Sequence, residues 1–204
     1  MFTKAKFYNL ALGALLLQRQ VINPETDQSN EAKVLNTFYD VAWRAALADM
    51  DLDSTSSQIQ LELLATDPIH GWCFAYKYPK NCAFFRRIQS CVRQDSRQTH
   101  IPKRVAIFNA QKVILTNKCN AIAEFIPEDI PLSTLAPNAG LAVSFRLAIL
   151  AAPLATGKGA AALINAIEKK YVMAKAEAQQ QDERENFTFE SEATMSEFVA
   201  VRLE

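Results

Sequence analysis

The chain has 204 residues, half of them hydrophobic, so it is long enough to bury one sizeable core. Its 22 basic and 22 acidic residues give a net charge of zero, which excludes a global field that would attract nucleic acid or a membrane surface. The four cysteines include no CxxC pair, and with only two histidines they lack the close ligand pairs of a structural zinc site. We therefore expect one domain with free thiols in a reducing cytoplasm.

The first predicted element is a helix over residues 4–22, where apolar residues recur at helical spacing on two faces, so the helix should be largely buried. Its sequence, KAKFYNLALGALLL, resembles the basic and apolar parts of a signal peptide. No small-residue cleavage site follows, however, and the apolar run is too short to cross a bilayer. We expect a helix of the folded protein, no segment of transmembrane length elsewhere, and a soluble protein without a membrane partner.

A second helix is predicted over residues 29–50, because Ser29 is a good N-cap and Glu31 suits the first helical turn. The period then changes from helical to alternating, which predicts a β-rich insertion over residues 56–130. SQIQLELLA indicates one half-buried strand, GWCFAYKYP another, and RVAIFNAQKVILT two strands joined by a turn at its central NAQ. The four aromatic residues of GWCFAYKYP share one parity and therefore one face of their strand.

Helical periodicity returns over residues 137–156 and 159–184, and Pro153 with the following TGKG ends or bends the first of these helices. The GKG stretch resembles a phosphate-binding loop. GxxxxGK[ST] is absent, however, and a helix precedes the stretch rather than a strand, so a helix-breaking turn is the better interpretation. Residues 187–204 are acidic with regularly spaced apolar residues, which indicates an extended C-terminal tail.

These elements predict a mainly α protein, in which a helical bundle of about four helices carries the β-rich insertion. Residues 1–186 form one domain in this interpretation, and the extended tail follows it. The sequence contains no internal repeat.

Charge is divided into blocks although its sum is zero. Residues 25–67 hold nine acids and two bases, residues 77–118 hold ten bases and one acid, and residues 177–204 hold eight acids and two bases. Chance and solvated faces are one explanation of such blocks. The other is a self-complementary subunit, whose basic middle segment meets acidic parts of its neighbours or lines a path for DNA.

Residues with catalytic chemistry form no pattern typical of an enzyme. A cysteine nucleophile with His70 or His100 as its base stays open, but nothing in the sequence places these residues together. Asp51 and Asp53 lie in an exposed-looking loop without a metal-binding motif, which indicates a solvated loop. We therefore predict a protein that is not an enzyme, with no catalytic residue, no cofactor and no metal.

Five segments occur along the chain in the order YNLALGALLL, NEAKVLNTFYDVAWRAAL, GWCFAYKYPKNCAFFRR, FRLAILAAPLATG and AKAEAQQQDERE. In this order they resemble the head-to-tail adaptor proteins of tailed bacteriophages, specifically the tail tubular protein A group of short-tailed phages, over residues 7–186. The most specific element is the Gly71-Trp72-x-Phe74-Ala75-Tyr76-x-x-Pro79 run, together with FYD and the arginine that follows it. LDSTSSQ departs from the family, in which many members place a Trp-x-Phe-Ala strand at that point.

The resemblance implies a structural virion protein. Adaptors of this group form a ring of twelve subunits beneath the portal after genome packaging; the ring prolongs the DNA channel and receives the tail nozzle protein. The implied partners are further copies of the chain, the portal protein, the nozzle protein, and double-stranded DNA that passes without specific binding. The implied location is the neck of the virion, between the capsid portal and the tail, after synthesis in the host cytoplasm.

Three sets of residues are expected to serve this role. The portal-binding set lies in the C-terminal tail, the region with which related adaptors grip the portal, and comprises Phe187, Phe189, Phe198, Val199, Val201 and Leu203. The candidates for the subunit interface or DNA channel are Arg86, Arg87, Arg93, Arg97, Lys103 and Arg104. The motif residues expected to pack a strand and its exit turn against the bundle, rather than to stack on bases, are Gly71, Trp72, Phe74, Tyr76 and Pro79.

The alternative from a different class is a sequence-independent DNA-binding module that uses residues 77–118, and neck proteins of long-tailed phages are an alternative within the same class. In an adaptor, modest basicity should face the channel, because each neutralised phosphate releases counterions and tightens the grip on DNA. We expect the arginines of the basic block to act in assembly rather than in folding, since exposed charges contribute little to stability.

Overall fold

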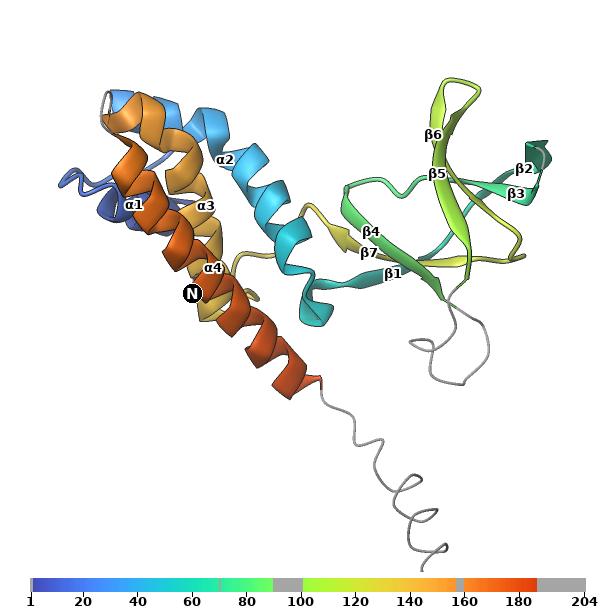
Figure 1. Ribbon diagram of the computed structural model, residues 1–204. Coiled ribbons are helices and arrows are strands. Elements are labelled where there is room, and N and C mark those ends of the chain that lie inside the picture. The colour runs from blue at the N-terminus through green and yellow to red at the C-terminus, as the bar shows by residue number, and fades with distance from the viewer. Residues whose placement is uncertain (1, 70, 90–100, 157–159, 187–204) are drawn as a thin grey trace, which may run out of the picture.

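The computed structural model describes residues 2–69, 71–89, 101–156 and 160–186. Within these residues the chain forms four α-helices, one short 3-10 helix and seven β-strands (Figure 1). In chain order the elements are α1 Lys4–Ala14, α2 Asn30–Met50, the 3-10 helix η1 Asp53–Thr55, β1 Ser57–Gln60, β2 Leu63–Ile69, β3 Trp72–Lys77, β4 Cys82–Gln89, β5 Lys103–Phe108, β6 Gln111–Thr116, β7 Ile122–Pro127, α3 Pro137–Thr156 and α4 Ala160–Glu185.

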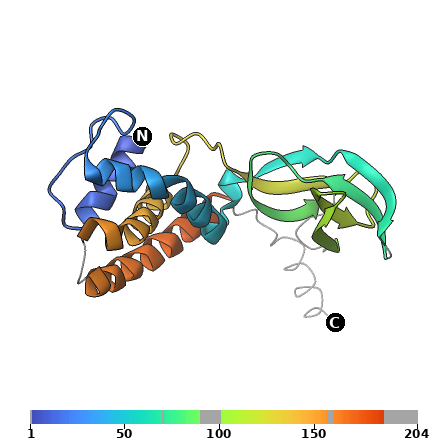
Figure 2. The same cartoon turned by 90° about the horizontal axis from the view of Figure 1, so that it is seen from above.

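The helices and the strands separate into two parts that lie side by side (Figures 1 and 2). The four helices pack into a bundle, and the strands form a β region that connects to it through the chain before β1 and after β7. Helices take up 48% of the described residues and strands 25%, so the prediction of a mainly α fold is wrong and the fold is mixed α/β. The physical reason is that the strands form two sheets that enclose a core of their own.

α1 is shorter than the helix predicted over residues 4–22, because it ends at Ala14. Leu16 adopts the left-handed conformation (φ 60°), which interrupts the helical path. The chain then folds back along α1. There the Asn9 side chain accepts a hydrogen bond from the Val21 N–H (2.8 Å) and donates one to the Val21 carbonyl (3.1 Å). These two bonds satisfy backbone groups that a longer helix would have paired internally.

α2 begins and ends with identifiable caps. Ser29 caps its start by accepting a hydrogen bond from the Ala32 N–H (3.2 Å). At the other end Asp51 adopts the left-handed conformation, and its N–H donates to the Leu47 carbonyl (3.1 Å). The turn at Asp51 leads the chain out of the bundle toward β1, so this carboxylate lies at the boundary between the two parts.

α3 is the central helix of the bundle and packs against α1, α2 and α4. Many of its buried residues are small, which lets the neighbouring helices approach closely. By length and composition it is long and apolar enough to cross a membrane, with a mean hydropathy of 1.6, so the expectation that no such segment exists is wrong. Half of that segment is buried in this structure, where its apolar side chains form the bundle core.

The β region contains two antiparallel sheets, one with strand order β1-β7-β4 and the other with order β2-β3-β6-β5. The single strand predicted for SQIQLELLA is wrong, because this stretch forms β1 and β2 in different sheets. At the change of sheet the Leu61 N–H donates to the Ala121 carbonyl, and the Glu62 carbonyl accepts from the Lys77 N–H, both at 2.9 Å. Leu61 is buried between the sheets, whereas Ile59 remains 48% exposed.

The hairpin predicted within RVAIFNAQKVILT is confirmed as β5 and β6. Phe108 pairs with Gln111, so Asn109 and Ala110 form a two-residue turn, and both have positive φ (49° and 60°). This backbone twist matches that of the flanking strands, and asparagine tolerates it well.

The aromatic residues of β3, and Tyr78 just after it, pack inside the β region. Tyr76 is 2% exposed, Phe74 and Tyr78 pack around the same core, and Trp72 packs against a smaller buried cluster. The core between the sheets consists of Leu61, Tyr76, Phe85, Ile88, Ile114, Ala121, Ala123 and Phe125. The prediction that these aromatic residues pack against the bundle is wrong, because β3 pairs with β2 and β6 and its neighbours are strands.

The bundle core predicts a contrast between two leucines of α3. Leu147 is fully buried and Leu154 is 62% exposed. Leu147→Ala should lower the free energy of unfolding by about 2–5 kcal/mol, because a cavity adds to the lost transfer energy. Leu154→Ala should change it by less than about 0.5 kcal/mol. Urea unfolding followed by circular dichroism measures both, and equal losses would contradict the placement of α3.

Candidate functional site

The boundary between the bundle and the β region is held by one arginine among three carboxylates. Arg86 of β4 contacts Asp51 through Nε (2.6 Å), and through Nη1 it contacts Asp53 (2.6 Å) and Glu124 of β7 (2.8 Å). Its side chain is 13% exposed. Burial alone would lower the pKa of the Arg86 guanidinium, but the hydrogen bond to Asp53 and the charges of all three carboxylates raise it. We call these four residues the ionic junction.

Glu124 is the most deeply buried member of the ionic junction, with its side chain 3% exposed. Arg87 Nε donates to its Oε2 (3.0 Å), and Gln89 Nε2 donates to the same oxygen (2.7 Å). Burial would raise the pKa of this carboxyl, but the hydrogen bonds from Arg87 and Gln89, with the charges of Arg87 and Arg86, outweigh burial and hold the pKa below its ordinary value. Glu124 is therefore a stable anion that fixes the two arginines on β4.

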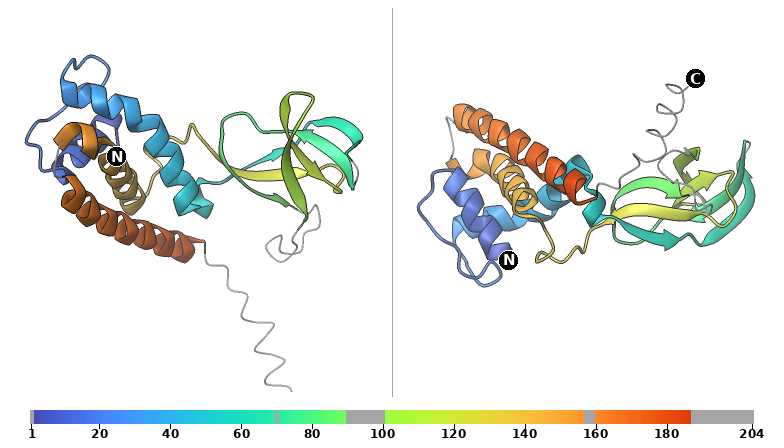
Figure 3. Two further views of the ribbon diagram at one scale, coloured as in Figure 1. Left: turned by 45° about the horizontal axis from the view of Figure 1, so that its top comes forward. Right: turned by 90° about the horizontal axis from the view of Figure 1, so that it is seen from below.

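The C-terminal end of α4 attaches to the same boundary. Asp182 accepts hydrogen bonds from the backbone N–H groups of Asp53 (2.6 Å) and Ser54 (2.9 Å), and Gln179 donates to the Met50 carbonyl (2.8 Å). Figure 3 shows this end of α4 beside the chain that leads from α2 to β1. The last turns of α4 therefore fix the position from which β1 starts.

A second set of bonds joins α2 to the chain after β7. Trp43 Nε1 donates to the Glu128 carbonyl (2.8 Å), and Arg44 forms an ion pair with the Glu128 carboxylate (2.7 Å). Trp43 in turn stacks on Tyr39, with ring centroids 6.3 Å apart. The FYD motif and the arginine that follows it thus belong to the packing of α2 and its link to the β region.

The basic candidate residues are placed differently from what the charge count suggested. Arg86 and Arg87 are bound to carboxylates of their own chain. Lys103 lies 4.2 Å from the centre of the Phe85 ring and donates to the Arg86 carbonyl. Burial and the charge of Arg87 lower the pKa of Lys103. Arg104 is exposed, so it alone among these four is available as a surface cation.

The other two basic candidates, Arg93 and Arg97, lie outside the described residues. So does the whole portal-binding set, whose members are Phe187, Phe189, Phe198, Val199, Val201 and Leu203. The premise that these arginines are exposed charges without a role in the fold is wrong for Arg86 and Arg87, because both side chains make internal ion pairs at the boundary. A role of the basic set in assembly stays a prediction.

The motif residues of β3 lie between the core and an open cleft. Gly71 precedes β3 with φ 90°, a conformation that side chains other than glycine rarely adopt. Phe74 and Tyr76 contact each other in the core (ring centroids 6.1 Å apart). Pro79 lies after the strand, where it lines the cleft. The motif is therefore structural at its centre and partly accessible at its C-terminal end.

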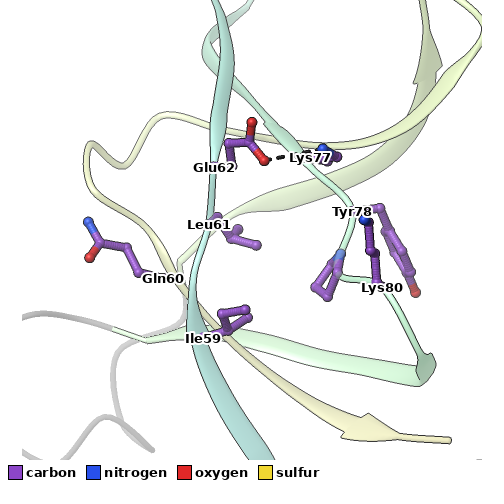
Figure 4. Close-up of a pocket in the computed structure, with 8 residues that line it drawn as sticks. Ile59, Gln60, Leu61, Glu62, Lys77, Tyr78 and Lys80 are labelled. Carbon is purple, nitrogen blue, oxygen red and sulfur yellow. Dashed lines mark hydrogen bonds and ion pairs between the residues drawn. The ribbon is translucent and has the colours of Figure 1, made fainter.

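The cleft has a volume of about 320 Å³ and is bounded by residues 59–62 on one side and residues 77–80 on the other (Figure 4). The two sides are joined where Lys77 pairs with Glu62 (3.2 Å), and they separate from there toward Ile59 and Lys80. Tyr78 lies on the second side, with the Lys112 Nζ 3.7 Å from its ring centre. The cleft thus combines apolar side chains with lysines.

Residues with catalytic or metal-binding chemistry do not converge in the described part of the chain. Among those residues no group of three or more His, Cys, Asp or Glu side chains is arranged to hold a metal ion. Cys73, Cys82 and Cys119 are free thiols. His70, His100 and the GKG stretch lie outside the described residues.

Several residues of the boundary are not evident from the sequence. The sequence predicts a solvated loop at Asp51 and Asp53, which is wrong because both bind Arg86. The sequence-based candidates also do not include Glu124 or Asp182. A signal for Glu124 exists, since it is the only acid within the apolar strand AIAEFIP, and a lone buried charge requires a partner. Asp182 lies in a run of charged residues that offers no comparable signal.

No protein-family model matches this chain, and no curated protein matches it.

The ionic junction predicts that charge reversal at Arg86 destabilises the fold much more than charge reversal at Arg104. Arg86→Glu should lower the free energy of unfolding by about 3–5 kcal/mol, because it places a fourth carboxylate among three with no cation between them. Arg104→Glu makes the same change at an exposed position and should cost less than about 1 kcal/mol. Urea unfolding of both variants at neutral pH measures the difference. Similar midpoints for both variants would show that the junction does not stabilise the fold.

The lowered pKa of Glu124 predicts a stability loss in acid. The folded protein holds this carboxyl ionised more strongly than the unfolded chain does, so the stabilisation is present above the unfolded pKa of about 4.3 and is lost as pH falls through the lower folded pKa. Glu124→Gln should therefore flatten the decline in unfolding free energy below about pH 4.5. Glu183→Gln, at an exposed position of α4, is the matched control. If the unfolding free energy of Glu124→Gln falls with decreasing pH as steeply as that of the unmodified protein, groups other than Glu124 cause the loss of stability in acid.

Proposed function

We propose that the protein is a structural head-to-tail connector of a tailed bacteriophage, which forms a ring, binds the portal protein, prolongs the DNA channel and receives the tail nozzle. The observation that supports this function best is the ordered set of five segments that resembles the adaptor family over nearly the whole chain. In the fold, these segments form helices and strands whose residues build the cores and the boundary.

The two-part architecture suits a ring subunit. A closed ring needs two different complementary surfaces on each copy, because the contact is head-to-tail. The bundle and the β region offer such surfaces in a fixed relative orientation, since the ionic junction and the Trp43 and Arg44 contacts hold them together. The zero net charge allows many copies to assemble without accumulating repulsion.

A connector must let DNA pass without gripping it. The described cations of the basic block support this requirement, because Arg86 and Arg87 are neutralised by carboxylates of their own chain. The same pairing weakens the rival function, a sequence-independent DNA-binding module, because ion-paired arginines release few counterions from a phosphate backbone. Of the described residues of this block, the exposed Lys80, Arg104 and Lys112 would still be available to a DNA-binding module.

The proposal predicts that the chain binds the portal of its phage through the C-terminal tail. Purified protein should co-sediment with portal rings. Replacing Phe187, Phe189, Phe198 and Val201 together by serine should lower this binding at least about tenfold, because each buried apolar side chain contributes about 1.5–3 kcal/mol before ordering costs. Leu16→Ser is the control, at a position of the bundle that is 79% exposed.

Two outcomes would contradict the proposal. Undiminished portal binding by the serine variant would move the contact away from the tail. Failure of the unmodified protein to bind portal rings, combined with tight and strongly salt-dependent binding of free duplex DNA, would favour the DNA-binding module instead. Titration of a fluorescently labelled DNA duplex with the protein at two salt concentrations measures the affinity for DNA and its salt dependence.

A further inference from the structure

The cleft is bordered by an unpaired strand edge. β1 is the last strand of its sheet, and within the described part of the chain its one strand partner is β7. Its other edge faces residues 78–80 across the cleft (Figure 4). All four residues of β1 are exposed. An exposed edge of this kind accepts an added strand through main-chain hydrogen bonds.

The side chains around this edge specify what kind of strand would fit. Ile59 is 48% exposed beside the buried Leu61, so the inner side of the cleft has an apolar surface that its own chain leaves half uncovered. Lys80 is exposed at the opposite rim, Glu62 is already paired with Lys77, and Lys112 lies over the ring of Tyr78, which also lines the cleft. An occupant should therefore alternate apolar residues with acids.

The chain carries such a segment immediately after α4. Residues 187–192 are FTFESE, in which Phe187 and Phe189 share one parity, and Glu190 and Glu192 share the other. In an extended strand these two sets lie on opposite faces. The phenylalanines would cover the apolar side of the cleft while the glutamates remain at the rim with the lysines.

The position of α4 brings this segment to the correct end of β1. Asp182 binds the backbone of Asp53 and Ser54, only a few residues before β1 starts at Ser57. Asn186, the last described residue, donates to the Asp182 carbonyl (3.0 Å), so the chain leaves α4 at this place. Six extended residues span about 20 Å, the same length as residues 57–62 of the cleft wall. No long linker is needed.

We propose that residues 187–192 dock into this cleft of their own chain, along the free edge of β1, in the unassembled subunit. The docking itself is independent of the proposed connector function. Its consequence for assembly rests on that function: the apolar residues with which the tail would bind the portal are held by the free subunit, and the portal must displace them from the cleft. This arrangement would keep the tail from binding other copies before a portal is present.

Photo-cross-linking in the full-length protein tests the docking directly. With p-benzoylphenylalanine in place of Phe189, irradiation of dilute protein should give monomers whose cross-linked peptides contain residues 57–62 or 77–80. The same probe in place of Phe198 is the control and should give at least about fivefold less of these products, because that position lies beyond the six residues that match the cleft. Products at other sites, or cross-links confined to covalent dimers, would overturn the proposal; dimers would assign the occupant to a second copy.

A charge exchange tests whether the lysine rim selects the segment. Lys80→Glu should lower the yield of the Phe189 cross-link about fivefold, and adding Glu190→Lys and Glu192→Lys should restore it. Lys33→Glu, at an exposed position of α2, is the matched control and should leave the yield unchanged. If Lys80→Glu leaves the cross-link yield unchanged, or if Glu190→Lys with Glu192→Lys does not restore the lost yield, the assignment is overturned. Because no portal protein is present, failure here is distinct from failure of the connector function.

Discussion

The relative position of the bundle and the β region depends on the charge of Arg86. This side chain extends from β4 toward the end of α2, where Asp51 and Asp53 meet it at 2.6 Å, and Glu124 holds it from the neighbouring strand. Without the guanidinium, three carboxylates would face one another at the boundary, and their repulsion would separate the two parts. A rigid subunit is what a ring requires, since small changes of angle in each copy accumulate around the circle.

This geometry shows that some of the oppositely charged blocks in the sequence pair with each other inside one chain. Asp51 and Asp53 belong to the first acidic block, and Arg86 and Arg87 to the basic block, so part of the complementarity between blocks is satisfied inside one chain. Asp182, from the acidic C-terminal block, binds backbone N–H groups of the first block rather than a cation. Among the described residues of the basic block, Lys80, Arg104 and Lys112 are exposed, and in the proposed connector modest basicity of this kind would let DNA pass without a tight grip.

Local periodicity predicted the helices and the β5–β6 hairpin well, since each depends on neighbours in the sequence, such as the Ser29 cap and the Asn109 turn. Local periodicity failed where the structure depends on contacts between residues that are distant in the sequence. α1 ends early where Leu16 turns left-handed and the returning chain binds Asn9 through Val21. The change of sheet lies at Leu61, whose backbone pairs with the distant Ala121. The ionic junction joins residues from three separate segments, and counting charges along the chain cannot reveal which of them meet. The cleft was likewise invisible, because its two sides come from β1 and from the exit of β3.

The central claim of this account is that copies of the chain form the ring between portal and tail. Cryo-electron microscopy of the neck of the phage particle tests it most directly. The account predicts a ring of identical subunits beneath the portal, each showing a four-helix bundle and a two-sheet β region joined as in Figure 1, with C-terminal segments reaching the portal. A neck whose density is filled by other proteins, or particles that lack this chain, would contradict it.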